Sequence, residues 1–163
     1  MKYSDDFFDE NHNLLLASVF GVLCGVVSGV AAVNNVGAAY IFLAIIIGNF
    51  IALKIDGIHH ILTLIIFIVI VLSGGLPEVS LAVLLICVLG ALSDEVGHEL
   101  IHTVSDNRFL NLFFEYRFVM KIVILILAVC GAFDVFVFIF FILFELSYVI
   151  AGVVFKRLSE KNS

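Results

Sequence analysis

The sequence predicts an all-α, polytopic membrane protein with six transmembrane helices, and three observations support this fold class. First, 63% of the 163 residues are hydrophobic and 13% are charged, whereas soluble domains are about half apolar and about a quarter charged. Second, the apolar residues fall into six long runs, with a single proline in the whole chain. Third, the basic residues gather on one side of the arrangement that these runs imply.

The six runs are the predicted spans, because a helix needs about 20 residues to cross a bilayer. They cover residues 14–33, 38–55, 60–74, 79–100, 110–131 and 134–155. Tight breaks at 33–37, 73–78 and 131–134 carry Asn, Gly, Pro, Glu or Asp, which form turns and cap the helix that follows. Little length remains outside the membrane, so we expect one helical-bundle domain over residues 1–163.

The basic residues predict the orientation of the spans. All eight lie in the N-terminal tail, the second or fourth connection, the C-terminal tail, or the helix segments nearest to these. They are Lys2, Lys54, Arg108, Arg117, Lys121, Lys156, Arg157 and Lys161. None lies in a tight break, so the positive-inside rule places both termini in the cytoplasm and makes the protein three helical hairpins.

The tails and cysteines predict little chemistry. Residues 1–13 are acidic rather than basic, so we expect the first span to remain as an anchor and not to be cleaved as a signal peptide. We assign no role to this tail or to residues 156–163. The three cysteines lie inside apolar runs without CxxC spacing and are interpreted as packing residues.

The first span carries small residues on one face. Gly21, Gly25 and Gly29 recur every four residues. Such a stripe lets another helix approach closely, which favours helix association in lipid. We interpret these glycines as a packing surface.

Two charged residues lie deep in the last two spans. If the chain turns at 131–134, Lys121 and Glu145 lie at equal depth on neighbouring antiparallel helices. A lone ionised side chain at mid-membrane costs about 2.5–3.5 kcal/mol on insertion scales, and a pair offsets much of this. We interpret the two as a structural ion pair; an ion or proton pathway, or snorkelling of Lys121 to the cytoplasmic face, is the alternative.

Two segments on the predicted cytoplasmic side hold most of the remaining polar chemistry. The first contains Asp56, His59 and His60, and the second covers residues 93–102. Four of the five histidines lie in these segments, among acidic residues. Imidazole and carboxylate groups are ligands of zinc, iron and manganese, so the clustering predicts a metal site.

Residues 98–102 read His-Glu-Leu-Ile-His, an HExxH pattern. On a helix, His98 and His102 share one face and can bind one Zn²⁺, while Glu99 polarises a bound water as the catalytic base. Glu95 extends this polar stripe by one turn and forms an ExxH unit with His98, which helix bundles use to hold paired metals. Paired Fe or Mn is therefore an alternative to Zn²⁺. The additional candidate ligands are Asp56, His59, His60, Asp94 and Glu115.

A second interpretation needs no cofactor. Residues 94–104 also place Val96, Leu100 and Val104 on the opposite face, as in an amphipathic helix that lies at the membrane surface with its polar side in water.

The HExxH pentapeptide at the end of an apolar helix resembles the zinc motif of site-2-type intramembrane metalloproteases. This resemblance implies that His98 and His102 bind zinc and that Glu99 is the general base. That family takes its third ligand from a Leu-Asp-Gly motif. Ile55-Asp56-Gly57 is similar, but it precedes the HExxH instead of following it.

The leading hypothesis is a metal-dependent hydrolase embedded in the membrane, with its site at the cytoplasmic interface and a membrane peptide or a lipid as substrate. A divalent-cation transporter with a cytoplasmic ring of acids and histidines is the second. A non-catalytic scaffold subunit is the third. The expected partners are the bilayer, this substrate and a second copy of the chain. Nucleic acid is excluded as a partner, because the chain has only eight basic residues and fourteen acidic ones.

Overall fold

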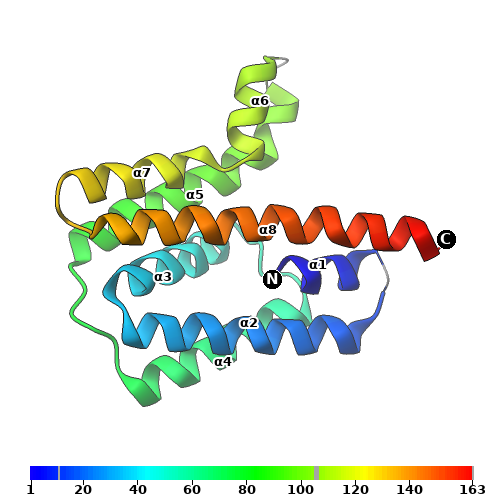
Figure 1. Cartoon of the computed structure of the whole chain (residues 1–163), viewed down its shortest axis with the longest axis horizontal. Coiled ribbons are helices and arrows are strands. Elements are labelled where there is room, and N and C mark those ends of the chain that lie inside the picture. The colour runs from blue at the N-terminus through cyan, green and yellow to red at the C-terminus, as the bar shows by residue number, and fades with distance from the viewer. Residues whose placement is uncertain (11, 105–106, 163) are drawn as a thin grey trace.

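A computed structural model describes residues 1–10, 12–104 and 107–162, and within them the protein is all-α, as predicted (Figure 1). These residues form eight helices and no strand. The helices are α1 (Lys2–Asp9), α2 (Leu14–Asn34), α3 (Val36–Ile51), α4 (Ile58–Gly74), α5 (Leu81–Val104), α6 (Arg108–Glu115), α7 (Phe118–Val129) and α8 (Val135–Asn162).

Three of the helices are long and apolar enough to cross a membrane. The segments that meet both conditions are Leu14–Asn34 in α2, Leu81–Ile101 in α5 and Val135–Phe155 in α8. Helices α3, α4 and α7 are apolar but shorter. At 1.5 Å per residue, α3 and α4 are about 24–26 Å long, close to the hydrocarbon thickness of a bilayer, and α7 is about 18 Å long.

Two of the predicted breaks are made by capping residues. Asn35 alone separates α2 from α3, and its side chain accepts a hydrogen bond of 3.0 Å from the Ala38 amide. Asp134 precedes α8 and accepts a hydrogen bond of 2.9 Å from the Phe136 amide. Each cap satisfies an amide that has no partner inside its helix.

The predicted span 110–131 is wrong as a single helix. The chain breaks after Glu115, and Arg117 adopts a left-handed backbone conformation with φ of 51°. A non-glycine residue in this region needs compensation from its surroundings. The Arg117 guanidinium supplies it by pairing with Glu95 of α5 at 3.0 Å, while Asp94 accepts hydrogen bonds from the first amides of α7.

The glycine stripe of α2 packs against α4. A Cβ at Gly21 would lie 2.7 Å from the His59 carbonyl oxygen, and one at Gly25 would lie 2.7 Å from that of Thr63. Larger residues would therefore push the two helices apart. This close packing brings the start of α4 into contact with α1. The main apolar core lies elsewhere, between α3, α5, α7 and α8, around Ile124 and Phe141.

Candidate metal centre

Helix α1 folds back onto the bundle instead of extending from it (Figure 1). Its aromatic side chains Tyr3 and Phe7 pack against Phe20 of α2 and Phe155 of α8. Ser4 is fully buried and donates a hydrogen bond of 2.6 Å to the Ala17 carbonyl. These contacts fix the rotation of α1, so that Asp5 faces the start of α4.

Helix α4 begins after Gly57, and its first turn carries His59 and His60. The His59 ring packs over Gly57 so closely that a Cβ there would lie 2.4 Å from its Cε1 atom. The Phe8 ring covers His59 with its centroid 4.6 Å away, and only 2% of the histidine is exposed. The imidazole is therefore held in one place by packing on both sides.

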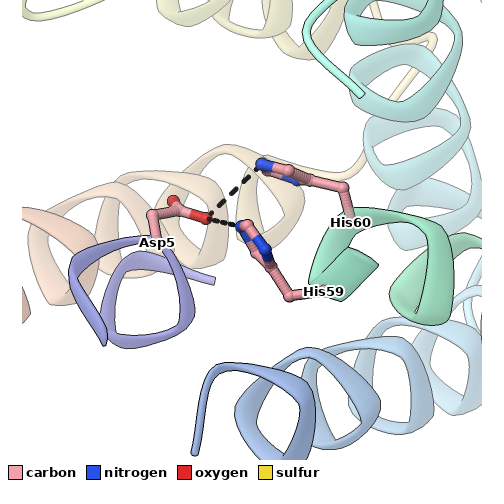
Figure 2. A group of neighbouring side chains, drawn as sticks. All are labelled: Asp5, His59 and His60. Atoms are coloured by element: carbon pink, nitrogen blue, oxygen red, sulfur yellow. Dashed lines mark ion pairs between the residues drawn. The ribbon is translucent and has the colours of Figure 1, made fainter. Parts of the chain in front are cut away.

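Asp5, His59 and His60 converge on one point, as Figure 2 shows. The Asp5 Oδ1 atom lies 3.2 Å from Nε2 of His59 and 3.6 Å from Nε2 of His60. Asp56, in the loop before α4, approaches His60 Nε2 to 3.7 Å from the solvent side. Residues from the N-terminal helix and from α4 thus form a cluster that the sequence spacing does not reveal.

The polar atoms of this cluster lack ordinary partners. Asp5 Oδ1 and both ring nitrogens of His59 are buried, and none of them has a hydrogen-bond partner among the described residues. The 3.2 Å approach of Asp5 to His59 is short enough for an ion pair but is not aligned as a hydrogen bond. Each buried polar group left unsatisfied costs about 1–3 kcal/mol, so such a cluster needs an occupant.

A divalent cation fits this set of ligands. Zinc binds imidazole nitrogen and carboxylate oxygen at about 2.0–2.1 Å in a tetrahedron, which separates neighbouring ligand atoms by about 3.3 Å. The measured separations of 3.2 and 3.6 Å lie near that value, and the ligand atoms of all three residues lie within 4.8 Å of one another. The cluster is therefore a candidate metal centre with two histidines and one carboxylate.

Burial also changes the charge state of Asp5. Desolvation raises the pKa of its carboxyl from 3.8 to about 7, and the neighbouring Asp6 and Asp9 add to the rise. The N-terminal amine and Lys2 oppose it. A bound cation favours the ionised carboxylate, so metal and proton compete for this group near neutral pH.

The cluster opens into a cavity of about 380 Å³ that runs into the bundle. Six of the residues that the sequence predicts as metal ligands line this cavity: Asp56, His59, His60, Asp94, Glu95 and His98. Its inner wall is apolar and includes Phe42, Ile46 and Phe144. The cavity is thus amphipathic, with acids and imidazoles at one end and aromatic rings at the other.

The polar stripe of α5 lines the cavity with Asp94, Glu95 and His98, whereas Glu99 lies outside it. Asp94 and Glu95 are buried and face α7, where Asp94 accepts hydrogen bonds from the Val119 and Met120 amides and Glu95 pairs with Arg117. His98 lines the cavity. Glu99, the predicted catalytic base, has a side chain that is 59% exposed and pairs with Lys54 at 3.2 Å.

The other two predicted ligands are not placed in the cavity. Glu115 is exposed on α6 and is absent from the cavity wall. The His102 side chain lies outside the described side chains, although its backbone continues α5.

Lys121 and Glu145 pair in the structure, as their equal depth predicts. Lys121 Nζ lies 3.0 Å from Glu145 Oε2, and both side chains are less than one-fifth exposed. Lys121 also donates to the carbonyl oxygens of Tyr116 and Arg117. The Lys121 amine thus keeps two carbonyl partners if Glu145 is removed. The Glu145 carboxylate, in contrast, pairs with no described cation other than Lys121.

Because of this asymmetry, Lys121→Met is expected to destabilise the protein more than Glu145→Gln. The first change leaves a largely buried carboxylate without its cation, which costs about 1–3 kcal/mol or more. Thermal unfolding of the two variants in detergent micelles measures the difference. A Lys121→Met/Glu145→Leu double variant is expected to recover most of the loss, and equal effects of the two single changes would contradict this account.

The candidate ligand that sequence reasoning misses is Asp5. The available signal is the pattern of residues 2–9, where Tyr3 and Phe7 lie four positions apart and Asp5, Asp6 and Asp9 fall between and after them. This is the pattern of an amphipathic helix. It indicates that the tail can dock on the bundle, but not which side chain it then presents to α4.

Comparisons of the chain with protein-family models, curated proteins and solved structures find no match.

Proposed function

We propose that this chain is an integral membrane protein that acts as a metal-dependent hydrolase, with Zn²⁺ bound by Asp5, His59 and His60. The observation that carries this proposal is the convergence of two imidazoles and a carboxylate, in which Asp5 Oδ1 and both His59 ring nitrogens are buried without a hydrogen-bond partner among the described residues. Buried groups of this kind are satisfied by a cation that all of them can bind at once.

In the proposed arrangement, six helices cross the membrane as the hairpins α2–α3, α4–α5 and α7–α8. All the basic residues then lie toward the cytoplasmic end, together with both termini. Helix α7 is short, but α6 precedes it with the exposed side chains Phe109, Leu110 and Leu112, which suit a helix lying at the membrane surface. The metal centre lies at the cytoplasmic boundary in this arrangement.

The chemistry follows from the position of the centre. Asp5, His59 and His60 would hold the cation, which would supply the activation of water that hydrolysis near neutral pH requires. The apolar inner wall of the cavity keeps bulk water away and strengthens the electrostatic effect of the metal. His98 lies on the same cavity wall and is the residue to which we assign proton transfer.

We expect His98→Gln to lower turnover by about 10²–10⁴-fold while leaving the bound metal in place. Glu99→Gln is the matched comparison, because Glu99 pairs with Lys54 and does not line the cavity. It is expected to change turnover less than about threefold, the range of a weak surface ion pair. Hydrolysis of a long-chain p-nitrophenyl ester in mixed micelles, together with metal analysis by mass spectrometry, measures both properties.

The opposite pattern would assign the chemistry differently. If Glu99→Gln loses turnover and His98→Ala loses the bound metal, the metal centre would be assigned to the HExxH motif instead. A metal-loaded wild type without turnover that conducts Zn²⁺ or Mn²⁺ in proteoliposomes would replace hydrolysis with transport. A wild type that binds no metal after reconstitution would leave only the scaffold role.

A further inference from the structure

A second cavity lies next to the cavity at the metal centre, along the bundle. The second cavity measures about 440 Å³ and shares the walls Phe42, Phe141 and Phe144 with the first. It ends beside Asn35 and Asp134, the residues that cap α3 and α8 at the opposite end of the bundle. We call the two adjoining cavities the trough.

Three helices each present one face to the trough. Helix α8 contributes Phe136, Phe140, Phe144 and Tyr148, which are spaced four residues apart. Helix α3 contributes Ala38, Phe42, Ile45 and Asn49, and α2 contributes Cys24, Ser28 and Ala31. These spacings of three and four keep each set on one side of its helix, so the same helix faces line both cavities.

The trough has the length and lining of a hydrocarbon-chain site. Phe136 and Tyr148 are twelve residues apart on α8, which corresponds to about 18 Å along the helix. That is more than half of the hydrocarbon thickness of about 30 Å. Phe136 and Phe140 are more than 60% exposed, so the trough is open along this side.

The polar end of the trough is strongly acidic. Of the charged side chains that line the first cavity, six are acidic and two, Lys54 and Arg117, are basic. Both basic groups already pair with glutamates. When the N-terminal amine and Lys121, which pairs with Glu145, are counted as well, a divalent cation would about balance the acidic groups. No excess positive charge then remains to attract an anionic headgroup.

We infer that the trough binds a single-chain lipid whose headgroup carries no net negative charge, with the headgroup at the metal centre and the chain along the aromatic face of α8. The inference rests on the proposed function, because it names the substrate class of that site.

The chain contains no tryptophan, so a single introduced tryptophan reports on the trough without background. Phe144→Trp places the reporter on the wall shared by both cavities, and Leu143→Trp places it on an exposed face of α8 that lines neither. The probes are a monoacylglycerol and a lysophosphatidic acid with brominated chains, which quench nearby tryptophan. Both reporters are measured in the full-length, zinc-loaded protein in micelles.

We expect the monoacylglycerol to quench the Phe144→Trp reporter saturably, at a mole fraction about tenfold or more below that required by lysophosphatidic acid. The Leu143→Trp reporter is expected to be quenched equally by both probes. Adding Ala38→Leu, which fills the second cavity, is expected to weaken monoacylglycerol binding about tenfold, because contacts of chain methylenes are lost. Ala82→Leu, on the exposed surface of α5, is the control and is expected to change nothing.

Equal quenching of the two reporters would overturn the binding of a lipid in the trough. Equal or tighter binding of lysophosphatidic acid would overturn the headgroup assignment. Metal content distinguishes these failures from a failure of the proposed function: zinc bound without lipid selectivity rejects the lipid inference alone, whereas absence of zinc rejects the metal-dependent hydrolase whatever the lipid result.

Discussion

Asp5→Asn is expected to weaken zinc binding by at least about 100-fold and, at the same time, to stabilise the metal-free protein at pH 8. The first effect follows because the change removes the one charged ligand that faces both histidines. Changes to the supporting shell of a metal site cost about 10–100-fold in affinity, and loss of a direct ligand costs at least as much. Competition with a fluorescent zinc chelator measures it.

The second effect follows from the pKa of Asp5, which burial raises from 3.8 to about 7. A raised pKa means that the folded state binds a proton more tightly than the unfolded state. The stability of the metal-free protein therefore falls as pH rises from about 4 to about 7 and stays low above that range. Asparagine does not ionise, so the variant avoids this loss, which we estimate as about 1–3 kcal/mol.

Thermal unfolding with a chelator at pH 5 and at pH 8 tests the sign of this effect. The advantage of Asp5→Asn over wild type is expected to be larger at pH 8 than at pH 5. Glu10→Gln is the control, because Glu10 is exposed on the same segment and lies outside the cluster. An Asp5→Asn protein that binds zinc as tightly as wild type would show that Asp5 is not a ligand.

Gly57→Ala is expected to abolish stoichiometric zinc binding although it alters no ligand. The added Cβ would lie 2.4 Å from Cε1 and 2.6 Å from Nδ1 of His59, and a Cβ does not approach nonbonded atoms that closely. The ring must move away, which takes Nε2 out of reach of Asp5. The backbone itself accepts alanine, because φ at Gly57 is −108°.

Two measurements separate this effect from misfolding. Metal content by mass spectrometry is expected to fall below one-tenth of that of wild type, by the same ligand-loss argument as for Asp5. A thermal midpoint of the metal-free variant close to that of metal-free wild type would show that the fold is retained and that only the position of the ring has changed. Full metal content in Gly57→Ala would mean that the observed position of His59 is not the metal-binding one.

Composition and hydrophobic runs predicted the all-helical fold and most of its boundaries. Helix α2 begins where the run 14–33 begins, and Asn35 and Asp134 lie at the predicted breaks because their side chains cap helices. The break at Arg117 could not be predicted from apolar content, because it depends on the pairing of Arg117 with Glu95 on another helix. Such long-range contacts leave no periodic signal in either segment.

The candidate site was predicted only in part for the same reason. Clustering of histidines with acids identified His59, His60 and Asp56, which the structure brings together near Asp5. Periodicity indicated which residues of α5 share a face but not what that face meets. Asp5 lies in a polar tail more than fifty residues before His59, and only the docking of α1 brings the two together.

The central claim is that the cation binds at Asp5, His59 and His60, and metal analysis of two double variants tests it most directly. Mass spectrometry of purified, zinc-reconstituted protein is expected to find one cation per chain in wild type and in His98→Ala/His102→Ala. None is expected in His59→Ala/His60→Ala. Full metal content in His59→Ala/His60→Ala, with loss in His98→Ala/His102→Ala, would contradict the account and place the metal at the HExxH motif.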